Sequence, residues 1–568
     1  MSTGQLGRQT ATAPSEEDRA KGLRLRLQLL VTSLVGPAGR ERARAAWRWL
    51  DSQFDRWRGP ARTVEPYVPG ETKLGWSLAR PAIMGFVATT AIFLGATQPN
   101  SPFTSKLPDS WYFGIPAPAL VQGYTPAPGQ WLFLGVVAVY GGMVLLIRAW
   151  YDIFKLTSEH PGFPVIRLAP VFVAWVLPLL VVAPLFSKDV YAYAAQGEMM
   201  SHGINPYLYG TGVLGATPFS HLVDRLWINS SSPYGPFFLV VDGWIVTVAH
   251  HDLLLSVVGL RLLALVGVIL FAVAVPSIAR SFGRDPATAF VLAALNPLVL
   301  LNLVGGAHND ALMVGLLAAG YAFCRRHRPV VGIVICGLAA AVKVPALIGA
   351  VYIGWEWLGP GRSIRERVRP VVTALLIAVG TMVCISEAAN LGWGWIGGLT
   401  EPDTVRSWLD PATGIALVLG HLVAVLGFGH HVHVILTVVR GTAACIAGLI
   451  GLWLLVNSER VGSLQALGWS LFAVVVLGPV VQLWYLSWSF VFLAPVAVGL
   501  TRKVIIGVSA VACFLGLTGG HVFINEIKSA NSVLVAFACA ALVAIGAFLL
   551  RPKYPRARPT PRELVSSS

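Results

Sequence analysis

Between residues 77 and 550 the chain contains about 14 apolar segments. About 20 apolar residues cross the roughly 30 Å hydrocarbon core of a bilayer as a helix. Lipid offers the backbone no hydrogen-bond partner, so helices are favoured over open strands. The pattern predicts an all-α polytopic membrane protein. The predicted spans are 77–96, 131–149, 167–186, 255–278, 287–305, 310–324, 329–342, 345–359, 370–388, 434–456, 464–481, 486–500, 504–519 and 533–550.

The composition excludes a soluble protein of this size. Of the 568 residues, 55% are hydrophobic and only 12% are charged, against about 25% charged in soluble chains. The formal net charge is +15, but the basic residues flank apolar runs and form no continuous stripe. We therefore expect membrane lipids as partners and no nucleic acid.

Two further apolar stretches, 236–249 and 413–428, decide the topology. If both lie in the membrane interface, most of the 42 Lys and Arg residues fall on one side, as the positive-inside rule requires. The same rule divides 329–359 into two short helices that meet at Lys343. It also predicts a multi-pass protein of the bacterial plasma membrane with both termini in the cytoplasm.

Three regions follow from this topology. Residues 1–75 form a basic cytoplasmic region, in which Trp47, Leu50, Phe54 and Trp57 recur at helical spacing, typical of an amphipathic helix. Residues 76–550 form the transmembrane domain. Residues 551–568 form a disordered basic tail, rich in Pro and Arg.

A polar cavity is predicted at the outer membrane boundary. Lys188, Arg261, Lys343 and Arg440 fall at the outer ends of predicted spans, where an unpaired charge costs up to about 3 kcal/mol. Several acidic residues lie on the same side. Fixed cations there are suited to a lipid phosphate; the alternative is that they reach toward lipid headgroups.

The first candidate site is the run from Ser187 to Glu198, which leaves the third predicted span. Asp189 emerges close to the hydrocarbon and precedes an aromatic, amphipathic helix. A carboxylate at this position is suited to removing a proton from an acceptor hydroxyl. The alternative is that Asp189 caps this helix and pairs with Lys188.

Two other outer hairpins carry polar or aromatic clusters. His308, Asn309 and Asp310 follow two glycines, a pattern that fits sugar or phosphate binding but also an ordinary turn. The stretch from Gln482 to Trp488 carries aromatic residues that suit sugar faces, although an interfacial belt has the same composition.

No metal site is predicted. The pairs His250-His251 and His430-His431 have no further ligands at metal-binding spacing, and the six cysteines lie inside or at the ends of apolar runs.

Five motifs together resemble one family: Ser187–Gly197, Asn205–Tyr207, Pro233–Pro236, Gly306–Asp310 and Gln482–Tyr485. In order and placement they are similar to the polyprenol-phosphomannose-dependent α-1,6-mannosyltransferases that build the mannan backbone of actinobacterial lipomannan. These enzymes belong to the C-type glycosyltransferase (GT-C) superfamily. The similarity covers roughly residues 75–550.

The resemblance implies a GT-C fold with two additional spans before a core that begins near residue 165. It implies that Asp189 is the catalytic base, which acts on the extracytoplasmic side. The chain has a single Asp there, where many relatives have an acidic pair, so no metal or other cofactor is expected. The residues expected to bind substrate are Lys188, Tyr191, Gln196, Arg261, His308, Asn309, Asp310, Lys343, Gln482, Trp484 and Tyr485.

The expected reaction moves mannose from polyprenyl-phosphate-mannose to a mannan or lipomannan acceptor in an α-1,6 linkage. A phosphate is already a good leaving group, so the paired carboxylates of glycosidases are not required. Attack opposite the phosphate inverts the anomeric carbon. Two alternatives remain: a related transferase that uses another polyprenyl-phosphate sugar such as arabinofuranose, and a lipid-linked sugar transporter or flippase.

Overall fold

The structure is a computed structural model that describes residues 73–97, 101, 103–104, 128–398, 410–426 and 432–516. Three predictions fall outside these residues: the amphipathic helix at 47–57, the span at 533–550 and the basic tail.

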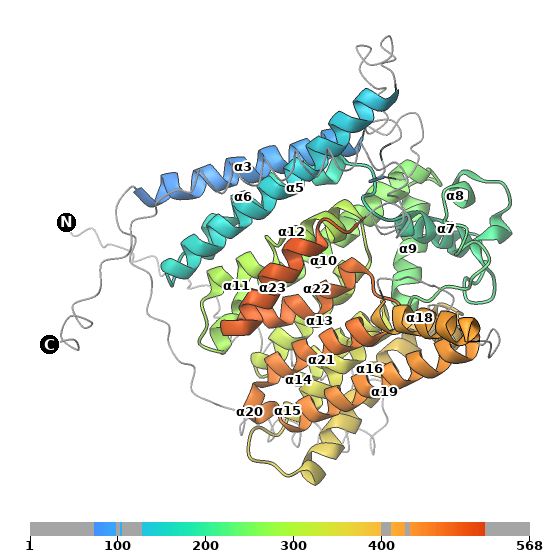
Figure 1. Cartoon of the computed structure of the whole chain (residues 1–568). Helices are drawn as coiled ribbons and strands as arrows, with labels where there is room; N and C mark the ends of the chain where they lie inside the picture. Colours follow the sequence, from blue (N-terminus) through green and yellow to red (C-terminus); the bar gives the residue numbers. More distant parts are fainter. Residues whose placement is uncertain are drawn as a thin grey trace, which may run out of the picture. The chain divides into compact units, whose positions relative to one another are not determined.

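The described residues are mainly helical, with one isolated β-bridge between Thr104 and Leu185 (Figure 1). Five helices are long and apolar enough to cross a membrane: α3 (Lys73–Ala96), α5 (Pro128–Glu159), α10 (Leu253–Ser281), α16 (Ile364–Ala388) and α19 (Val432–Val456). A sixth candidate, residues 286–305, is bent by 42°. The prediction of an all-α polytopic membrane protein is confirmed, whereas the count of 14 spans is not.

Shorter helices occupy most of the other predicted spans. They are α6 (Ala169–Val181), α11 (Pro286–Ala293), α12 (Pro297–Val299) with the π-helical segment η4 (Leu300–Gly305), α13 (Asp310–Arg325), α14 (Pro329–Ala340), α15 (Leu347–Glu356), α21 (Ser463–Leu477), α22 (Leu486–Leu493) and α23 (Gly499–Ala512). Outside the predicted spans lie α7 (Asp189–Ser201), α8 (Pro218–His221), α9 (Pro236–Val248), α17 (Gly394–Gly397), α18 (Pro411–Val425) and α20 (Ser458–Val461).

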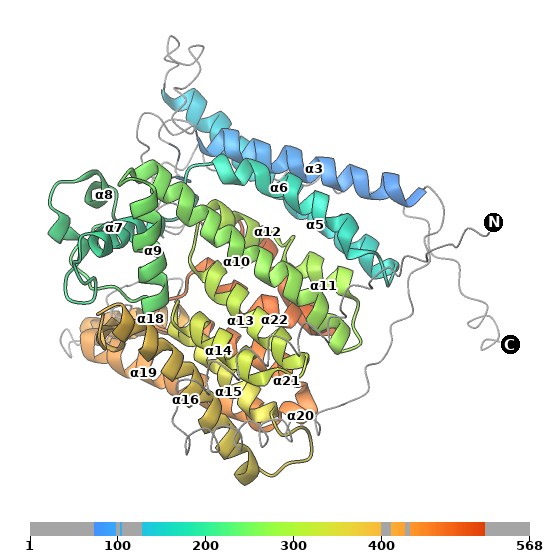
Figure 2. The ribbon, with the colours of Figure 1, turned by 180° about the vertical axis from the view of Figure 1, so that it is seen from behind.

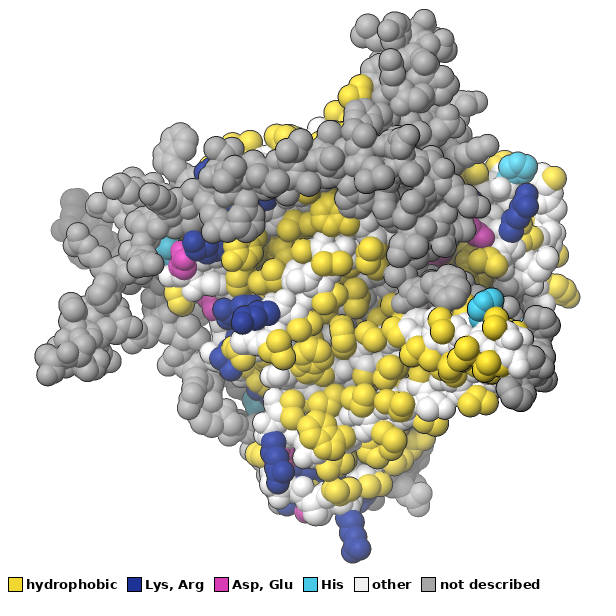
Figure 3. Space-filling view, viewed as in Figure 1, with side chains coloured by type: hydrophobic (Ala, Val, Ile, Leu, Met, Phe, Trp, Pro, Cys, Tyr) yellow, Lys and Arg dark blue, Asp and Glu magenta, His cyan; other side chains and the backbone are white. Residues whose placement is uncertain are grey.

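Basic residues from separate loops meet at one end of the bundle, called here the basic end. Arg325, at the end of α13, donates a hydrogen bond to Ser281 at the end of α10. Arg367, near the start of α16, pairs with Glu459 in α20. On the face drawn in Figure 3, most Lys and Arg side chains lie on the side away from α7 and α8. The loops that the positive-inside rule groups together therefore do lie together.

The opposite end carries α7 and is called here the α7 end. The hairpin between α14 and α15 reaches it, because the carbonyl of Ala341 accepts a hydrogen bond from Phe237 in α9. Lys343 stands at the tip of this hairpin, just before a 3-10 turn over Val344–Ala346. The predicted division of 329–359 into two short helices that meet at Lys343 is confirmed.

Neither α9 nor α18 crosses the bundle. Both ends of α9 lie at the α7 end, since Phe237 contacts Ala341 and His251, just beyond α9, contacts Glu198 of α7. Figures 1 and 2 show α9 lying across this end. The helix α18 begins beside Val481 and runs against the first part of α19, where Arg440 donates to Thr413. These contacts agree with the predicted interfacial position of 236–249 and 413–428, and the sidedness of the spans stays a prediction.

The two additional N-terminal helices, α3 and α5, lie alongside α6 (Figures 1 and 2). The indole of Trp175 in α6 donates to the carbonyl of Ala82 in α3 at 2.9 Å. On the other side of the bundle, α19 leaves large apolar side chains such as Leu449 and Trp453 exposed, and hydrophobic side chains cover the region of α18 and α19 in Figure 3. These surfaces are suited to lipid.

Candidate active site

A strained turn delivers Asp189 to the α7 end. Phe186 has φ 63°, a left-handed conformation that costs a non-glycine residue about 1–3 kcal/mol. The neighbouring Leu185 donates its backbone N–H to the Gly305 carbonyl at 3.1 Å, which ties this turn to the end of η4. Asp189 then opens α7, and its backbone N–H is held by the Ser187 hydroxyl at 3.0 Å.

A second strained turn delivers His308. The residue before it, Ala307, has φ 55°, and α13 begins two residues later at Asp310. The His308 Nδ1 lies 3.6 Å from the Asp189 Oδ2. The His308 ring stacks on Trp484 with 3.7 Å between ring centroids. Two turns far apart in the sequence thus meet at the Asp189 carboxylate.

Lys343 forms the third part of this cluster. Its Nζ donates to the Asp310 Oδ1 at 2.9 Å, and the Trp488 indole N–H donates to the same oxygen at 2.7 Å. The Lys343 Nζ also lies 4.3 Å from the centre of the Tyr485 ring and 5.7 Å from that of Tyr234, within range of cation–π attraction. The ammonium group is held between one carboxylate and an aromatic wall.

The protonation states follow from burial and from this lysine. Burial raises the pKa of Asp189 to about 6, although the positive charge of Lys343 opposes the rise. Burial, together with Lys343, holds the pKa of His308 well below its ordinary value, so the imidazole is neutral. Burial by itself would lower the pKa of Lys343, but Asp310, Tyr485 and Asp189 together outweigh burial, and the pKa lies above its ordinary value. Near neutral pH Asp189 is ionised beside a neutral His308 and a charged Lys343.

Several buried polar atoms at this cluster have no hydrogen-bond partner among the described residues. They are the two ring nitrogens of His308, the Asn309 Nδ2 and the Asp310 Oδ2. Buried polar atoms are nearly always paired, and leaving one unpaired costs about 1–3 kcal/mol. The predicted turn at 308–310 therefore keeps hydrogen-bonding capacity that an ordinary turn would use, which suits the hydroxyl groups of a sugar.

The contacts of Asp189 and of the aromatic hairpin bear on two alternative interpretations, a helix cap at Asp189 and an interfacial aromatic belt at 482–488. Among the described residues, the Asp189 carboxylate lies 3.6 Å from the neutral His308 ring and forms no ion pair with Lys188, and Lys188 itself holds the N-cap position of α7. Trp484 is buried against His308, and Tyr485 lies over Lys343. These contacts favour a polar site over a helix cap and over an interfacial aromatic belt.

Other predicted residues lie outside this cluster or join it indirectly. Arg261 is buried in α10 and donates to the backbone carbonyls of Leu180, Val182 and Gly305. These contacts support a structural role, and its binding of a phosphate stays a prediction. Gln196 is buried and accepts a hydrogen bond from Ser232. The predicted binding roles of Lys188, Tyr191 and Gln482 stay predictions too.

Three residues of the cluster were not among the predicted site residues. Trp488 binds Asp310; Tyr193 donates to the Asn309 Oδ1 at 3.4 Å; and Tyr234 packs edge-on against Tyr193. Tyr193 and Trp488 fall in stretches noted above for their aromatic residues, and Tyr234 falls in the Pro233–Pro236 motif. The pattern alone could not separate them from aromatic residues that pack in lipid.

Comparison with known proteins identifies the family. Residues 82–359 match the model described as "Alpha-(1->6)-mannopyranosyltransferase, N-terminal domain", and residues 412–549 match the MptB C-terminal domain. The first match contains Asp189, His308 and Lys343, and the second contains Trp488. No solved structure gives a significant match.

Three relatives that carry this activity in their names match most of the chain. Alpha-(1->6)-mannopyranosyltransferase A of Mycobacterium tuberculosis is 32% identical, over 74% of this chain and 80% of the relative. A probable alpha-(1->6)-mannopyranosyltransferase of Mycolicibacterium smegmatis is 29% identical, over 83% and 88% respectively. Alpha-(1->6)-mannopyranosyltransferase B of Corynebacterium glutamicum is 31% identical, over 66% and 69%. The chain thus belongs to the alpha-(1->6)-mannopyranosyltransferase family and is a membrane mannosyltransferase.

Proposed function

We propose that this enzyme transfers mannose from polyprenyl-phosphate-mannose to a mannan or lipomannan acceptor, forms an α-1,6 linkage and inverts the anomeric carbon. Membership of the family supports mannosyl transfer. The lipid-linked donor, the acceptor and the stereochemical course are part of the proposal.

The proposed reaction needs two groups, a base for the acceptor hydroxyl and a cation for the departing phosphate. The acceptor hydroxyl oxygen attacks the anomeric carbon, and the Asp189 carboxylate takes the hydroxyl proton. The bond from the anomeric carbon to the phosphate oxygen breaks, and the phosphate leaves with the electron pair. Lys343 is the nearby cation suited to the charge that develops on this phosphate.

Exposure supports Asp189 over Asp310 as the base. The Asp189 side chain is 22% exposed, whereas that of Asp310 is fully buried and holds Lys343 and Trp488. An acceptor hydroxyl therefore has access to the first carboxylate and not to the second. The unpaired polar atoms of His308 and Asn309 beside it carry the proposal, because they offer hydrogen bonds to the sugar at the point where the base stands.

The distribution of basic residues supports an extracytoplasmic site. Arg280, Arg325 and Arg367 lie at helix ends that meet at the basic end, and such basic clusters are cytoplasmic under the positive-inside rule. Asp189 lies at the α7 end, so we assign it to the outer face.

Donor use tests the proposed function. Membranes are prepared from cells that express the chain and are supplied with an α-1,6-mannan acceptor. We expect them to consume radiolabelled polyprenyl-phosphate-mannose and to leave polyprenyl-phosphate-arabinofuranose unused. Linkage analysis is expected to find new α-1,6-mannosyl residues. Consumption of the arabinofuranosyl lipid instead, or movement of the intact lipid across the bilayer without transfer, would contradict the proposal.

Activity is expected to depend on pH through Asp189. The base works only when ionised, and its pKa is about 6, so kcat/KM is expected to rise with pH through about 6 and then level off. The Lys343 charge lowers this pKa more strongly than the Asp310 charge raises it, so removal of both charges is expected to move the rise to slightly higher pH. Rate profiles of the purified enzyme and of a Lys343→Met/Asp310→Asn variant measure this shift. A flat profile between pH 5 and 8 would contradict the assignment.

A further inference from the structure

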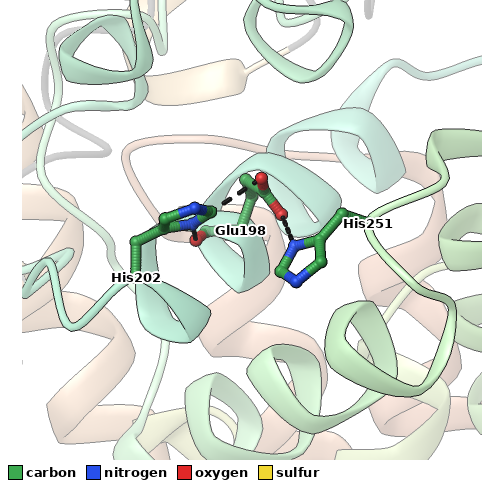
Figure 4. Close-up of side chains that lie close together, drawn as sticks. All are labelled: Glu198, His202 and His251. Atoms are coloured by element: carbon green, nitrogen blue, oxygen red, sulfur yellow. Dashed lines mark hydrogen bonds and ion pairs between the residues drawn. The ribbon is translucent and has the colours of Figure 1, made fainter.

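Glu198, His202 and His251 converge beyond the active site, near the last turn of α7 (Figure 4). Glu198 and His202 are four residues apart and share one side of the helix. His251 comes from the turn between α9 and α10, and its Nδ1 lies 2.7 Å from the Glu198 Oε2. One metal-ligating atom from each residue lies within 4.8 Å of the other two.

The backbone at this point is shaped to present His251. His250 and His251 both have left-handed conformations, with φ 53° and 60°, which residues other than glycine seldom adopt. Close packing holds the facing helix, because a Cβ at Gly243 of α9 would lie 2.7 Å from the Cβ of Met200 in α7. The histidine and the carboxylate therefore face each other across a rigid contact.

The hydrogen bond that His202 makes leaves the lone pair of its other ring nitrogen available. The His202 Nδ1 lies 2.9 Å from the backbone carbonyl of Glu198, which can only accept a hydrogen bond. This nitrogen therefore carries the proton, and the Nε2 retains its lone pair. A histidine whose other nitrogen donates to a carbonyl is the usual form of a metal ligand.

The donor set selects the kind of ion. One carboxylate and two imidazoles match a three-ligand zinc site, with bonds of about 2.0–2.2 Å and a fourth position for water. Calcium and magnesium prefer oxygen ligands. The side chains of His202 and His251 are 55% and 45% exposed, whereas that of Glu198 is 13% exposed, so an ion has access from solvent to a largely enclosed carboxylate.

We propose that Glu198, His202 and His251 bind one Zn²⁺ ion, which ties α7 to the turn between α9 and α10. Asp189 lies near the opposite end of α7, about 14 Å away at 1.5 Å per residue. The ion is thus too far from the base to take part in transfer, and its effect is to hold the helix that carries the base. No metal site was predicted here from the sequence, because His251 is far from Glu198 along the chain.

Metal binding by the full-length enzyme tests this proposal. The chain is purified in detergent with a tag that contains no histidine, stripped with a chelator and titrated with ZnSO₄. We expect about one tightly bound Zn²⁺ per chain by mass spectrometry, a higher midpoint of thermal unfolding with zinc, and no such rise with Ca²⁺ or Mg²⁺.

The two neighbouring histidines supply a matched pair of variants. His251→Asn removes a ligand, and asparagine tolerates the left-handed conformation. We expect it to weaken zinc binding by at least about 100-fold, since loss of an outer-shell contact already costs 10–100-fold. His250→Asn changes the same residue type in the same conformation outside the cluster, and should bind zinc normally. His202→Asn should behave as His251→Asn does.

Two results would overturn the proposal. One is the absence of zinc binding by the folded, unmodified chain, which would leave Glu198 and His251 as an ion pair alone. The other is an equal loss of zinc in His250→Asn and His251→Asn. Binding is measured without donor or acceptor, so either failure leaves the proposed reaction untouched.

Discussion

The Asp189→Asn variant is expected to lose mannosyl transfer, with kcat lowered by a factor of roughly 10²–10⁴, the usual contribution of a general base. The amide keeps the size of the side chain but cannot take the proton. Asp189 is partly exposed and faces the neutral His308 ring at 3.6 Å, so the variant should fold. Transfer of radiolabelled mannose by the purified protein gives kcat, and thermal unfolding checks the fold.

Asp224→Asn is a suitable control for this experiment. Asp224 contributes to the charge felt by Asp189, but its Oδ1 accepts a local hydrogen bond from the backbone of Leu226 at 3.0 Å. We expect its activity to stay within about twofold of the unmodified enzyme, because surface substitutions seldom change stability by more than about 0.5 kcal/mol. Near-normal turnover in Asp189→Asn would remove the base assignment.

The Lys343→Met variant is expected to lose both stability and donor use. Removing the lysine leaves the fully buried Asp310 carboxylate without its cation, and breaking a buried pair from one side costs about 3–5 kcal/mol. The thermal unfolding midpoint should therefore fall sharply. This loss alone would not reveal whether Lys343 also contacts the donor phosphate.

The Lys343→Met/Asp310→Asn variant separates the two effects. It removes both charges, so most of the stability should return. The KM for the lipid donor should stay raised by at least about tenfold, because hydrogen bonds to a charged group contribute about 1.5–3 kcal/mol. The single Asp310→Asn variant shows how much of the change in stability and in donor KM comes from the loss of Asp310.

Lys155→Met serves as the control for loss of a lysine. Lys155 pairs with Glu159 on the same helix at 3.7 Å and is 43% exposed, so little change is expected. A normal donor KM in the stable double variant would show that Lys343 serves only to neutralise Asp310. The phosphate role would then be withdrawn.

The arrangement of the spans could be predicted from the sequence, because hydrophobic length and the position of basic residues are local properties. The positive-inside rule predicted two features: the short hairpin with Lys343 at its tip, and a helix at 236–249 that does not cross the bundle. The contacts of Ala341 and His251 agree with both. The exact spans were harder to assign. Helices such as α15 and α22 fall below the length expected for crossing a bilayer, and hydropathy cannot distinguish a short span from a partly inserted helix.

The candidate site could be predicted as a set of motifs, but not as a set of contacts. The sequence placed Asp189, the turn at His308 and the aromatic hairpin at one side of the membrane. It could not pair Lys343 with Asp310, which lies 33 positions away, or Asp310 with Trp488, which lies 178 positions away. For Arg261 a charge at the end of a span predicted a ligand, whereas its described partners are backbone carbonyls.

The sequence by itself determined that this chain lies in a membrane, which loops share a side, and which polar residues stand at the boundary. Only the tertiary structure decided which of those residues touch, which cation is neutralised by a carboxylate and which histidine faces α7. The physical reason is the distance along the chain over which each kind of interaction acts. Transfer into lipid depends on short stretches of side chains taken in order, whereas ion pairs and hydrogen bonds depend on separations of a few ångströms that helix packing sets.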